Sequence, residues 1–261
     1  MIDVFDAHFH IIDHDYPIVE NNGFKPDEFR LYDYFEQCRA LDLEPRGGAI
    51  VSGSFQGFDQ DYLINALSHL PKTYVGVAQL PLTLSDEALK ELHHYRIRAI
   101  RYNLYRNMVD TSWQAMIDFS RKVQAMFGWH TELYVDLAQF DQVFALIDAL
   151  DQVVVDHLGF SEIKPAQLDR LLNRGVRFKA SGFGRISMDP MAAMQHMMAI
   201  NPGSVLFGTD LPGTRARRRI STDDIEQIQT RFDAASCRRI FVDNAAELYL
   251  KNGDKPNNYI E

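Results

Sequence analysis

Residues 3–10 read DVFDAHFH, a short apolar segment that ends in alternating histidines. Seven more short runs, rich in β-branched and aromatic residues, follow along the chain. They span residues 47–52, 74–80, 97–103, 130–136, 152–158, 176–181 and 204–210. Runs of this length, bounded by polar turns, are typical of buried strands. The sequence therefore predicts eight strands, of which 3–10 is the first.

Segments whose apolar residues recur at helical spacing lie between the expected strands. The clearest are 58–70, 85–95, 138–150 and 164–174. Strands that alternate with helices pair in parallel, and eight such units close into a barrel of about 250 residues. We therefore predict an α/β fold, a single-domain (β/α)8 TIM barrel over residues 1–261. A long loop is expected at about 11–29 and a short polar tail from about 251.

The composition argues against several classes of partner. With 36 acidic and 27 basic residues the formal net charge is −9, whereas nucleic-acid-binding domains carry a basic surface. No apolar run approaches the roughly 18 residues of a membrane span, and the N-terminus has no signal-peptide pattern. Cys38 and Cys237 lack disulfide or zinc-finger spacing. We expect a cytoplasmic protein that binds neither nucleic acid nor membrane. The sequence leaves open whether it forms a homo-oligomer.

Polar residues stand where barrel enzymes carry their catalytic groups, at the C-terminal ends of the strands. His8 and His10 end the first expected strand, His157 ends the sixth and Asp210 ends the eighth. Residues two apart on a strand share a face, so both imidazoles of the pair can point to the barrel axis. By the same rule we expect the side chain of His157 to share a strand face with the valines two and four residues before it. Each residue could instead have a purely structural role, such as a helix N-cap for Asp210. Because the ends of three strands would bring all four residues to one mouth of the barrel, we predict a catalytic centre.

Three of these strand ends resemble motifs of a known superfamily. DAHFH, VVVDHLG and VLFGTDLP (6–10, 153–159 and 205–212) are similar to those of the amidohydrolase superfamily. They most resemble its second amidohydrolase group, which includes 2-pyrone-4,6-dicarboxylate lactonase. IRAIRYN, GWHTELYVD and FVDNAAELY (97–103, 128–136 and 241–249) look like corresponding stretches of that branch. The resemblance spans nearly the whole chain, in order, and implies a TIM-barrel hydrolase.

The strand-five position departs from the pattern of metal-binding members. Those members share the HxH pair and the final aspartate with this chain, but they also place a histidine on strand five. Together such residues hold a zinc-like ion, which lowers the pKa of a bound water. Here Glu132 and Tyr134 stand on that strand, and His130 lies at its far end. Strand four ends in Arg101 and Asn103 rather than in a lysine. The lactonase that the chain resembles works without metal, and Tyr134 matches its pattern.

The resemblance implies hydrolysis of a carboxylated lactone or related carboxylic ester, with no cofactor required. By analogy, Asp210 takes a proton from water while His8, His10 and His157 polarise the substrate carbonyl. One alternative is a zinc-dependent amidohydrolase or decarboxylase that uses His8, His10 and Asp210 as ligands of a divalent metal. Another is a catalytically inert barrel that acts as a binding subunit.

Arginines near the strand ends predict a small anionic, carboxylated substrate, because guanidinium binds carboxylate bidentately. Arg101 and Arg106 follow strand four and Arg185 follows strand seven. The resemblance implies that they bind the carboxylates of the substrate. We expect Tyr134 to donate a hydrogen bond to a substrate oxygen.

Two other cationic features have less specific interpretations. The run RARRR (215–219) is expected to form a solvated patch or surface salt bridges, because successive helix positions point in different directions. Lys179, within strand seven, could pair with an acidic side chain or contact the substrate.

Overall fold

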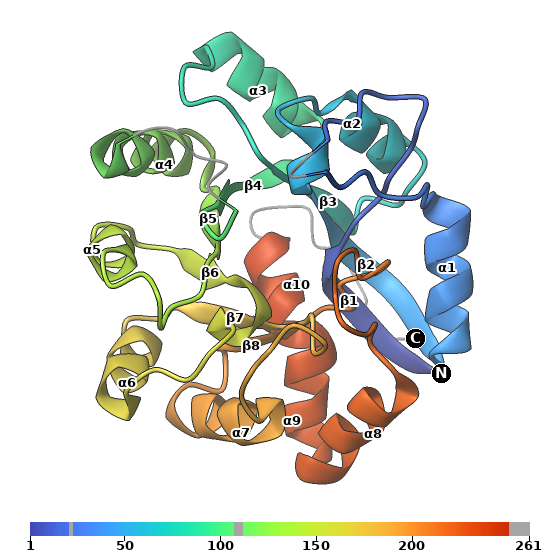
Figure 1. The fold of residues 1–261 in the computed structure, drawn as a ribbon, viewed down its shortest axis with the longest axis vertical. Coiled ribbons are helices and arrows are strands. Elements are labelled where there is room, and N and C mark those ends of the chain that lie inside the picture. The colour runs from blue at the N-terminus through green and yellow to red at the C-terminus, as the bar shows by residue number, and fades with distance from the viewer. Residues whose placement is uncertain (21–22, 107–111, 251–261) are drawn as a thin grey trace.

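The computed structural model describes residues 1–20, 23–106 and 112–250. Eight parallel strands follow one another in chain order and curve into a barrel (Figure 1), so the predicted (β/α)8 TIM-barrel class is confirmed. The strands are β1 (Ile2–Phe9), β2 (Leu43–Val51), β3 (Tyr74–Ala78), β4 (Ile97–Asn103), β5 (His130–Tyr134), β6 (Val153–Val155), β7 (Arg177–Ala180) and β8 (Val205–Phe207).

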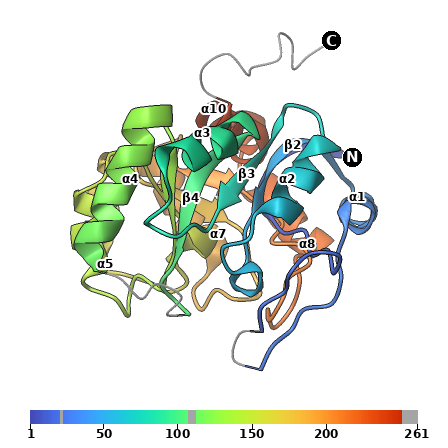
Figure 2. The same cartoon turned by 90° about the horizontal axis from the view of Figure 1, so that it is seen from above.

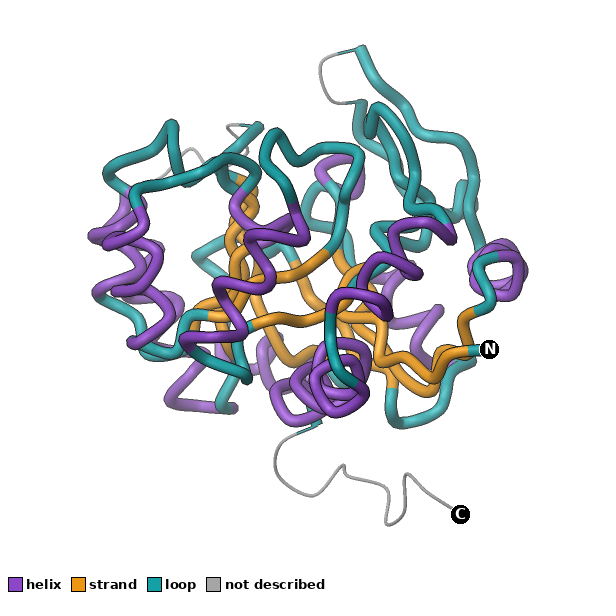
Figure 3. Tube along the Cα trace, turned by 90° about the horizontal axis from the view of Figure 1, so that it is seen from below, coloured by secondary structure: helices purple, strands orange, loops and turns teal. Residues whose placement is uncertain are grey.

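Helices surround the barrel and cover one of its ends (Figure 1). They are α1 (Leu31–Ala40), α2 (Asp61–Ser68), α3 (Asp86–His94), α4 (Trp113–Phe127), α5 (Val143–Asp148), α6 (Pro165–Asn173), α7 (Pro190–Ile200), α8 (Thr222–Arg231), α9 (Ala234–Arg238) and α10 (Asn244–Tyr249). Figure 2 shows α10 at one end of the barrel and the long loop after β1, in dark blue, at the other. Figure 3 shows the same two ends, one covered by helix and the other by loops. The site must therefore open on the end that carries this loop.

Two apolar layers stabilise the barrel, because the strands are buried on both faces. Outside, the strands pack against the helices. Inside, small and β-branched side chains meet α10 in a cluster of Phe5, Ala7, Ala49, Val51, Val75, Val77, Ala99, Val154, Leu206, Ala245, Leu248, Tyr249 and Leu250. Further along the axis the interior becomes charged, since the side chains of Arg101, Glu132 and Lys179 are also buried.

The end of β1 is tied to the segment after β8 by four hydrogen bonds. The backbone N–H of Asp210 donates to His8 O at 2.7 Å, and that of His10 donates to Leu211 O at 2.8 Å. The Asp6 carboxylate accepts from the backbone N–H and the hydroxyl of Thr209, at 2.9 and 2.6 Å. The two ends of the sheet thus meet beside the predicted catalytic residues.

His157 reaches the barrel mouth by a path that the sequence prediction missed. The expected strand 152–158 ends at Val155, and His157 lies in the short turn η2 (Asp156–Gly159) with a positive φ of 52°. Val153 and Val155 pack in the outer layer, so the predicted phase of His157 with them is wrong. The left-handed backbone, rare for a residue with a side chain, turns the imidazole toward the axis.

The loop expected at about 11–29 is present, and an isolated bridge joins its ends at Ile12 and Phe29. The tail expected from about 251 lies outside the described residues. Among the helices that are described, none is long and apolar enough to cross a membrane.

Gly208 allows β1 and β8 to approach each other, which gives a first prediction. A Cβ at this position would lie 2.7 Å from His8 Cβ and 2.9 Å from the His8 backbone nitrogen. Gly208→Ala should therefore lower the free energy of unfolding by about 1–3 kcal/mol, as overpacking does, measured by urea denaturation. Gly203→Ala is the control, because the nearest atom there is 3.3 Å away. Equal stability of the two variants would contradict the tight approach at Gly208.

Candidate active site

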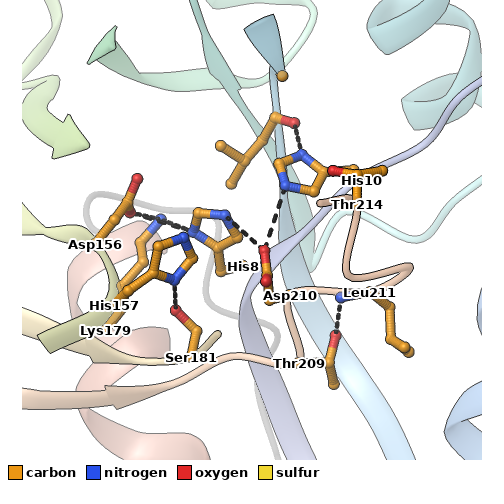
Figure 4. A network of polar contacts seen from close by, with 12 residues as sticks. His8, His10, Asp156, His157, Lys179, Ser181, Thr209, Asp210, Leu211 and Thr214 are labelled. Atoms are coloured by element: carbon orange, nitrogen blue, oxygen red, sulfur yellow. Dashed lines mark hydrogen bonds and ion pairs between the residues drawn. The ribbon is translucent and has the colours of Figure 1, made fainter. Parts of the chain in front are cut away.

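The four predicted catalytic residues lie together at the loop end of the barrel (Figure 4). The ring centroid of His8 lies 5.1 Å from that of His10 and 4.9 Å from that of His157. Asp210 Oδ1 lies 3.8 Å from His8 Nε2 and 3.6 Å from His10 Nε2. All four side chains are buried. The structure therefore brings these residues into one cluster.

Asp210 is held as a carboxylate in the left-handed backbone region. It follows β8 with a φ of 56°, and it is not a helix N-cap, since α8 begins only at Thr222. Burial alone would raise the pKa of Asp210, but the Arg185 guanidinium and the neighbouring imidazoles hold it well below its ordinary value. Arg185 Nε donates to Oδ2 at 2.7 Å. Oδ1 has no hydrogen-bond partner among the described residues and faces the imidazoles.

The imidazoles differ in what they offer to a ligand. His10 Nδ1 lies 2.7 Å from Val51 O, and a carbonyl only accepts, so Nδ1 carries a hydrogen and a neutral His10 presents a lone pair at Nε2. Burial lowers the pKa of His8 to about 4, despite the nearby Asp156 carboxylate. Burial also holds the pKa of His157 well below its ordinary value; its Nδ1 lies 3.0 Å from Ser181 Oγ. His8 and His157 are therefore neutral near pH 7.

His8, His10 and Asp210 could hold a metal ion, as predicted for the alternative mechanism. One ligand atom from each lies within 4.8 Å of the others, and imidazole with carboxylate suits a zinc-like ion. The bond from His10 Nδ1 to a backbone carbonyl is the usual way to orient a ligating histidine. By residue type and spacing the set fits a metal.

The four predicted substrate-binding residues line one pocket above this cluster. Arg101, Arg106, Tyr134 and Arg185 share it with His10, His157 and Asp210. Tyr134 stands at the end of β5, where its ring lies 4.7 Å from the Arg101 guanidinium carbon and 5.4 Å from the His157 ring. His130 lies at the other end of β5 and contacts Glu132 at 3.0 Å, as expected from its position.

Arg101 has a protein partner that the sequence did not reveal. Its Nε and Nη2 atoms lie 2.9 and 2.8 Å from Asp156 Oδ2, and Nη1 donates to Ser52 O at 2.9 Å. Arg101 is only 4% exposed. Its guanidinium thus borders the pocket while three of its nitrogens are engaged by the protein.

Arg215 and Phe24 also line the pocket, and neither is among the predicted substrate-binding residues. The Arg215 guanidinium carbon lies 4.2 Å from the centroid of the Phe24 ring. The run 215–219 is a loop and not a helix, and Arg215 faces the pocket instead of belonging to the expected solvated patch. Arg218, in contrast, forms the expected salt bridge, with Asp224 at 2.6 Å. The available signal was position, because Arg215 follows the last strand at the barrel mouth.

Comparison with known proteins agrees with this site. The model of the amidohydrolase family Amidohydro_2 matches residues 5–251. The chain belongs to the amidohydrolase family. It is 21% identical over 280 residues to 2-pyrone-4,6-dicarboxylate hydrolase of Comamonas testosteroni and 24% identical over 273 residues to 4-sulfomuconolactone hydrolase of Rhizobium radiobacter. Each alignment covers 94% of this chain and 89% of the relative.

A solved structure of a Pseudomonas putida protein, provisionally named as a 2-pyrone-4,6-dicarboxylic acid hydrolase, is also similar. Its TM-score is 0.77 at 26% identity, with 98% of this chain and 100% of that chain covered. The predicted superfamily is therefore confirmed, and the chain is a hydrolase of the amidohydrolase type.

The contact between Arg185 and Asp210 gives a second prediction. Without the guanidinium, burial would favour the protonated acid, so Arg185→Met should raise the pKa of Asp210 and leave a carboxylate only at higher pH. The carbon-13 shift of the Asp210 carboxyl, followed against pH, measures this change. Arg218→Met, which removes the partner of Asp224, is the control. Identical titration of Asp210 in both variants would show that Arg185 does not hold the charge.

Proposed function

We propose that this amidohydrolase opens a carboxylated lactone, or a related carboxylic ester, with Asp210 as the general base. The proposal is carried by the Asp210 carboxylate, which is ionised by its contact with Arg185 and leaves Oδ1 without a hydrogen-bond partner among the described residues, facing the imidazoles. Such a group can take a proton from a water molecule. The relatives named as hydrolases of a pyrone dicarboxylate and of a sulfomuconolactone support a ring ester that bears anionic groups.

The attacking water is proposed to lie between Asp210 Oδ1 and His10 Nε2, which are 3.6 Å apart. Both atoms accept, so the water can donate one hydrogen to each and direct a lone pair at the carbonyl carbon. As its oxygen forms the new bond, Asp210 takes one proton. The ring C–O bond then breaks and the proton passes to the departing ring oxygen. The products are a carboxylic acid, which ionises, and a hydroxyl group.

Polarisation of the carbonyl is assigned to the other two imidazoles. A neutral ring whose Nε2 carries the hydrogen can donate to the developing oxyanion, and fixed donors of this kind lower the barrier by several kcal/mol. His8 and His157 are neutral and buried, as this role requires. His10 departs from the predicted role, because a neutral His10 accepts at Nε2 and would bind the water instead.

The arginines favour an anionic substrate. Burial and the nearby Arg106 guanidinium lower the pKa of Arg215, so two cationic side chains lie near each other at the mouth. A carboxylate between Arg106 and Arg215 would relieve this repulsion. Arg185 could also form an ion pair with the substrate, which would weaken its contact with Asp210. The pKa of Asp210 would then rise, and Asp210 would become a stronger base as the substrate binds.

The zinc-dependent alternative uses the same His8, His10 and Asp210 atoms, and a bound ion would supply a water of lowered pKa. We favour a reaction with no required cofactor, since Arg185 already occupies one oxygen of Asp210 and β5 offers Tyr134 where a ligating histidine would stand.

Asp210→Asn tests the role of the base. It keeps the shape of the side chain but removes the proton acceptor, so kcat should fall by roughly 10²–10⁴, measured with a panel of carboxylated lactones and a pH indicator. Glu226→Gln, an exposed carboxylate on α8, should leave kcat unchanged. Near-normal turnover by Asp210→Asn would refute the assignment. If the native protein hydrolyses no lactone of the panel, the alternative of a catalytically inert barrel is favoured.

Tyr134 separates the two mechanisms. Tyr134→Phe should lower kcat/KM about tenfold, the effect of one lost hydrogen bond, and Tyr134→His should tighten zinc binding by adding an imidazole at the β5 position. Calorimetry with zinc alone and metal analysis of the native protein measure the second effect. Tyr105→Phe, whose ring packs 5.4 Å from Tyr134, is the control. Full activity of Tyr134→Phe, with tight zinc in the native protein and loss of turnover in chelator, would favour the metal-dependent reaction.

A further inference from the structure

A series of buried polar groups connects α10 with His8 through the barrel interior. Tyr249 of α10 donates a hydrogen bond to Glu132, and the Lys179 ammonium binds the other oxygen of that carboxylate. Lys179 Nζ also lies 3.4 Å from His8 Nδ1 and 3.6 Å from Asp156 Oδ1. Figure 4 shows Lys179 approaching His8 from the side of Asp156. Lys179 and Glu132 are fully buried and do not line the pocket.

The contact with Lys179 constrains which nitrogen of His8 carries the proton. An ammonium group has donors and no acceptor, so a hydrogen bond between Lys179 Nζ and His8 Nδ1 requires Nδ1 to accept. A neutral imidazole has a single N–H. That hydrogen is then on Nε2, the atom that lies 3.8 Å from Asp210 Oδ1 and has no hydrogen-bond partner among the described residues.

Asp156 competes for the same nitrogen of His8. Its Oδ1 lies 3.2 Å from Nδ1 and, as an acceptor, would favour a hydrogen there. Within the described part of the chain, however, this oxygen makes no hydrogen bond of acceptable geometry. Asp156 is instead neutralised by Arg101 at its other oxygen. A hydrogen on Nδ1 would also point toward the hydrogens of the Lys179 ammonium, so the contact between Lys179 and His8 prevails.

We propose that Lys179 is a positioning residue that holds His8 in the Nε2–H tautomer and thereby makes it a hydrogen-bond donor to the substrate oxygen. The role as donor rests on the proposed lactone hydrolysis, whereas the tautomer does not. Lys179 acts only through His8, since it does not line the pocket.

The same contact disfavours metal binding by His8. A ligating histidine needs a lone pair toward the metal and donates its other N–H to a carboxylate or carbonyl. His10 meets this requirement through Val51 O, but His8 presents a hydrogen at Nε2. Without Lys179, Asp156 Oδ1 at 3.2 Å would take the Nδ1 hydrogen. The Nε2 lone pair of His8 would then complete the metal set with His10 and Asp210.

The test compares two variants that differ only at Lys179. Replacing Lys179 alone would leave Glu132 as a buried charge without its cation, which destabilises a fold. Glu132→Gln is therefore the reference, because it retains the ammonium beside His8. The double variant Glu132→Gln/Lys179→Met removes the ammonium as well. Both are compared with the native protein in their thermal unfolding.

Nitrogen-15 shifts of the labelled histidine rings report the tautomer directly. We expect the proton of His8 on Nε2 in the native protein and in Glu132→Gln, and on Nδ1 in the double variant. Zinc alone, titrated by calorimetry, should bind the double variant about tenfold or more tightly than Glu132→Gln, the scale of effects from groups that orient metal ligands. With an active lactone, the double variant should lose about 10²-fold in kcat relative to Glu132→Gln, with little change in KM.

A proton on His8 Nδ1 in the native protein would overturn the proposal without any variant, so a failure of the double variant to fold does not protect it. Equal tautomer and equal zinc affinity in the two variants would overturn it as well. Failure of the native protein to hydrolyse any lactone would refute the proposed function alone, because the nitrogen shifts and zinc titration need no substrate.

Discussion

The hydrogen bonds that close the barrel between β1 and the segment after β8 determine where the residues of the candidate site lie. Asp210 donates its backbone N–H to His8, and Asp6 binds Thr209 through both carboxylate oxygens. These contacts place the Asp210 carboxylate beside the HxH pair, although the two segments lie at opposite ends of the sequence. Glycine is required at position 208 because a Cβ there would collide with the backbone nitrogen and Cβ of His8. The contacts that close the barrel therefore also bring the residues of the site together.

Burial acts in opposite directions on the acids and the imidazoles of this site. It lowers the pKa of His8 and His157, so these rings stay neutral. It would also protonate Asp210 and Asp156, but the arginines that bind them keep the pKa of both carboxyl groups low. An ionised carboxylate beside neutral rings is the division of charge that the proposed hydrolysis needs, and it arises because the carboxylates bind arginines.

In the proposed function, the groups that react and the groups that bind the substrate lie at different depths along the barrel axis. The deeper groups are held by ion pairs on strand ends, as with Arg101 and Asp156. Phe24 and Arg215 come from loops that meet over the pocket. Loops can change without disturbing the barrel, and groups fixed to strands keep their geometry. Under the proposed function, substrate preference therefore depends mainly on the residues at the mouth, and the type of reaction depends on the groups below them.

Local pattern in the sequence was enough to predict the barrel and the four central residues. Alternating strand and helix periodicity allows few other folds, and His8, His10 and Asp210 follow from their places at strand ends. The sequence could not show the left-handed turn that directs His157, the pairing of Arg101 with Asp156, or the contact between Lys179 and His8. Periodicity tells which face of a strand a residue occupies. Contacts across a barrel depend on register, curvature and turn conformation, which exist only when all eight strands are in place.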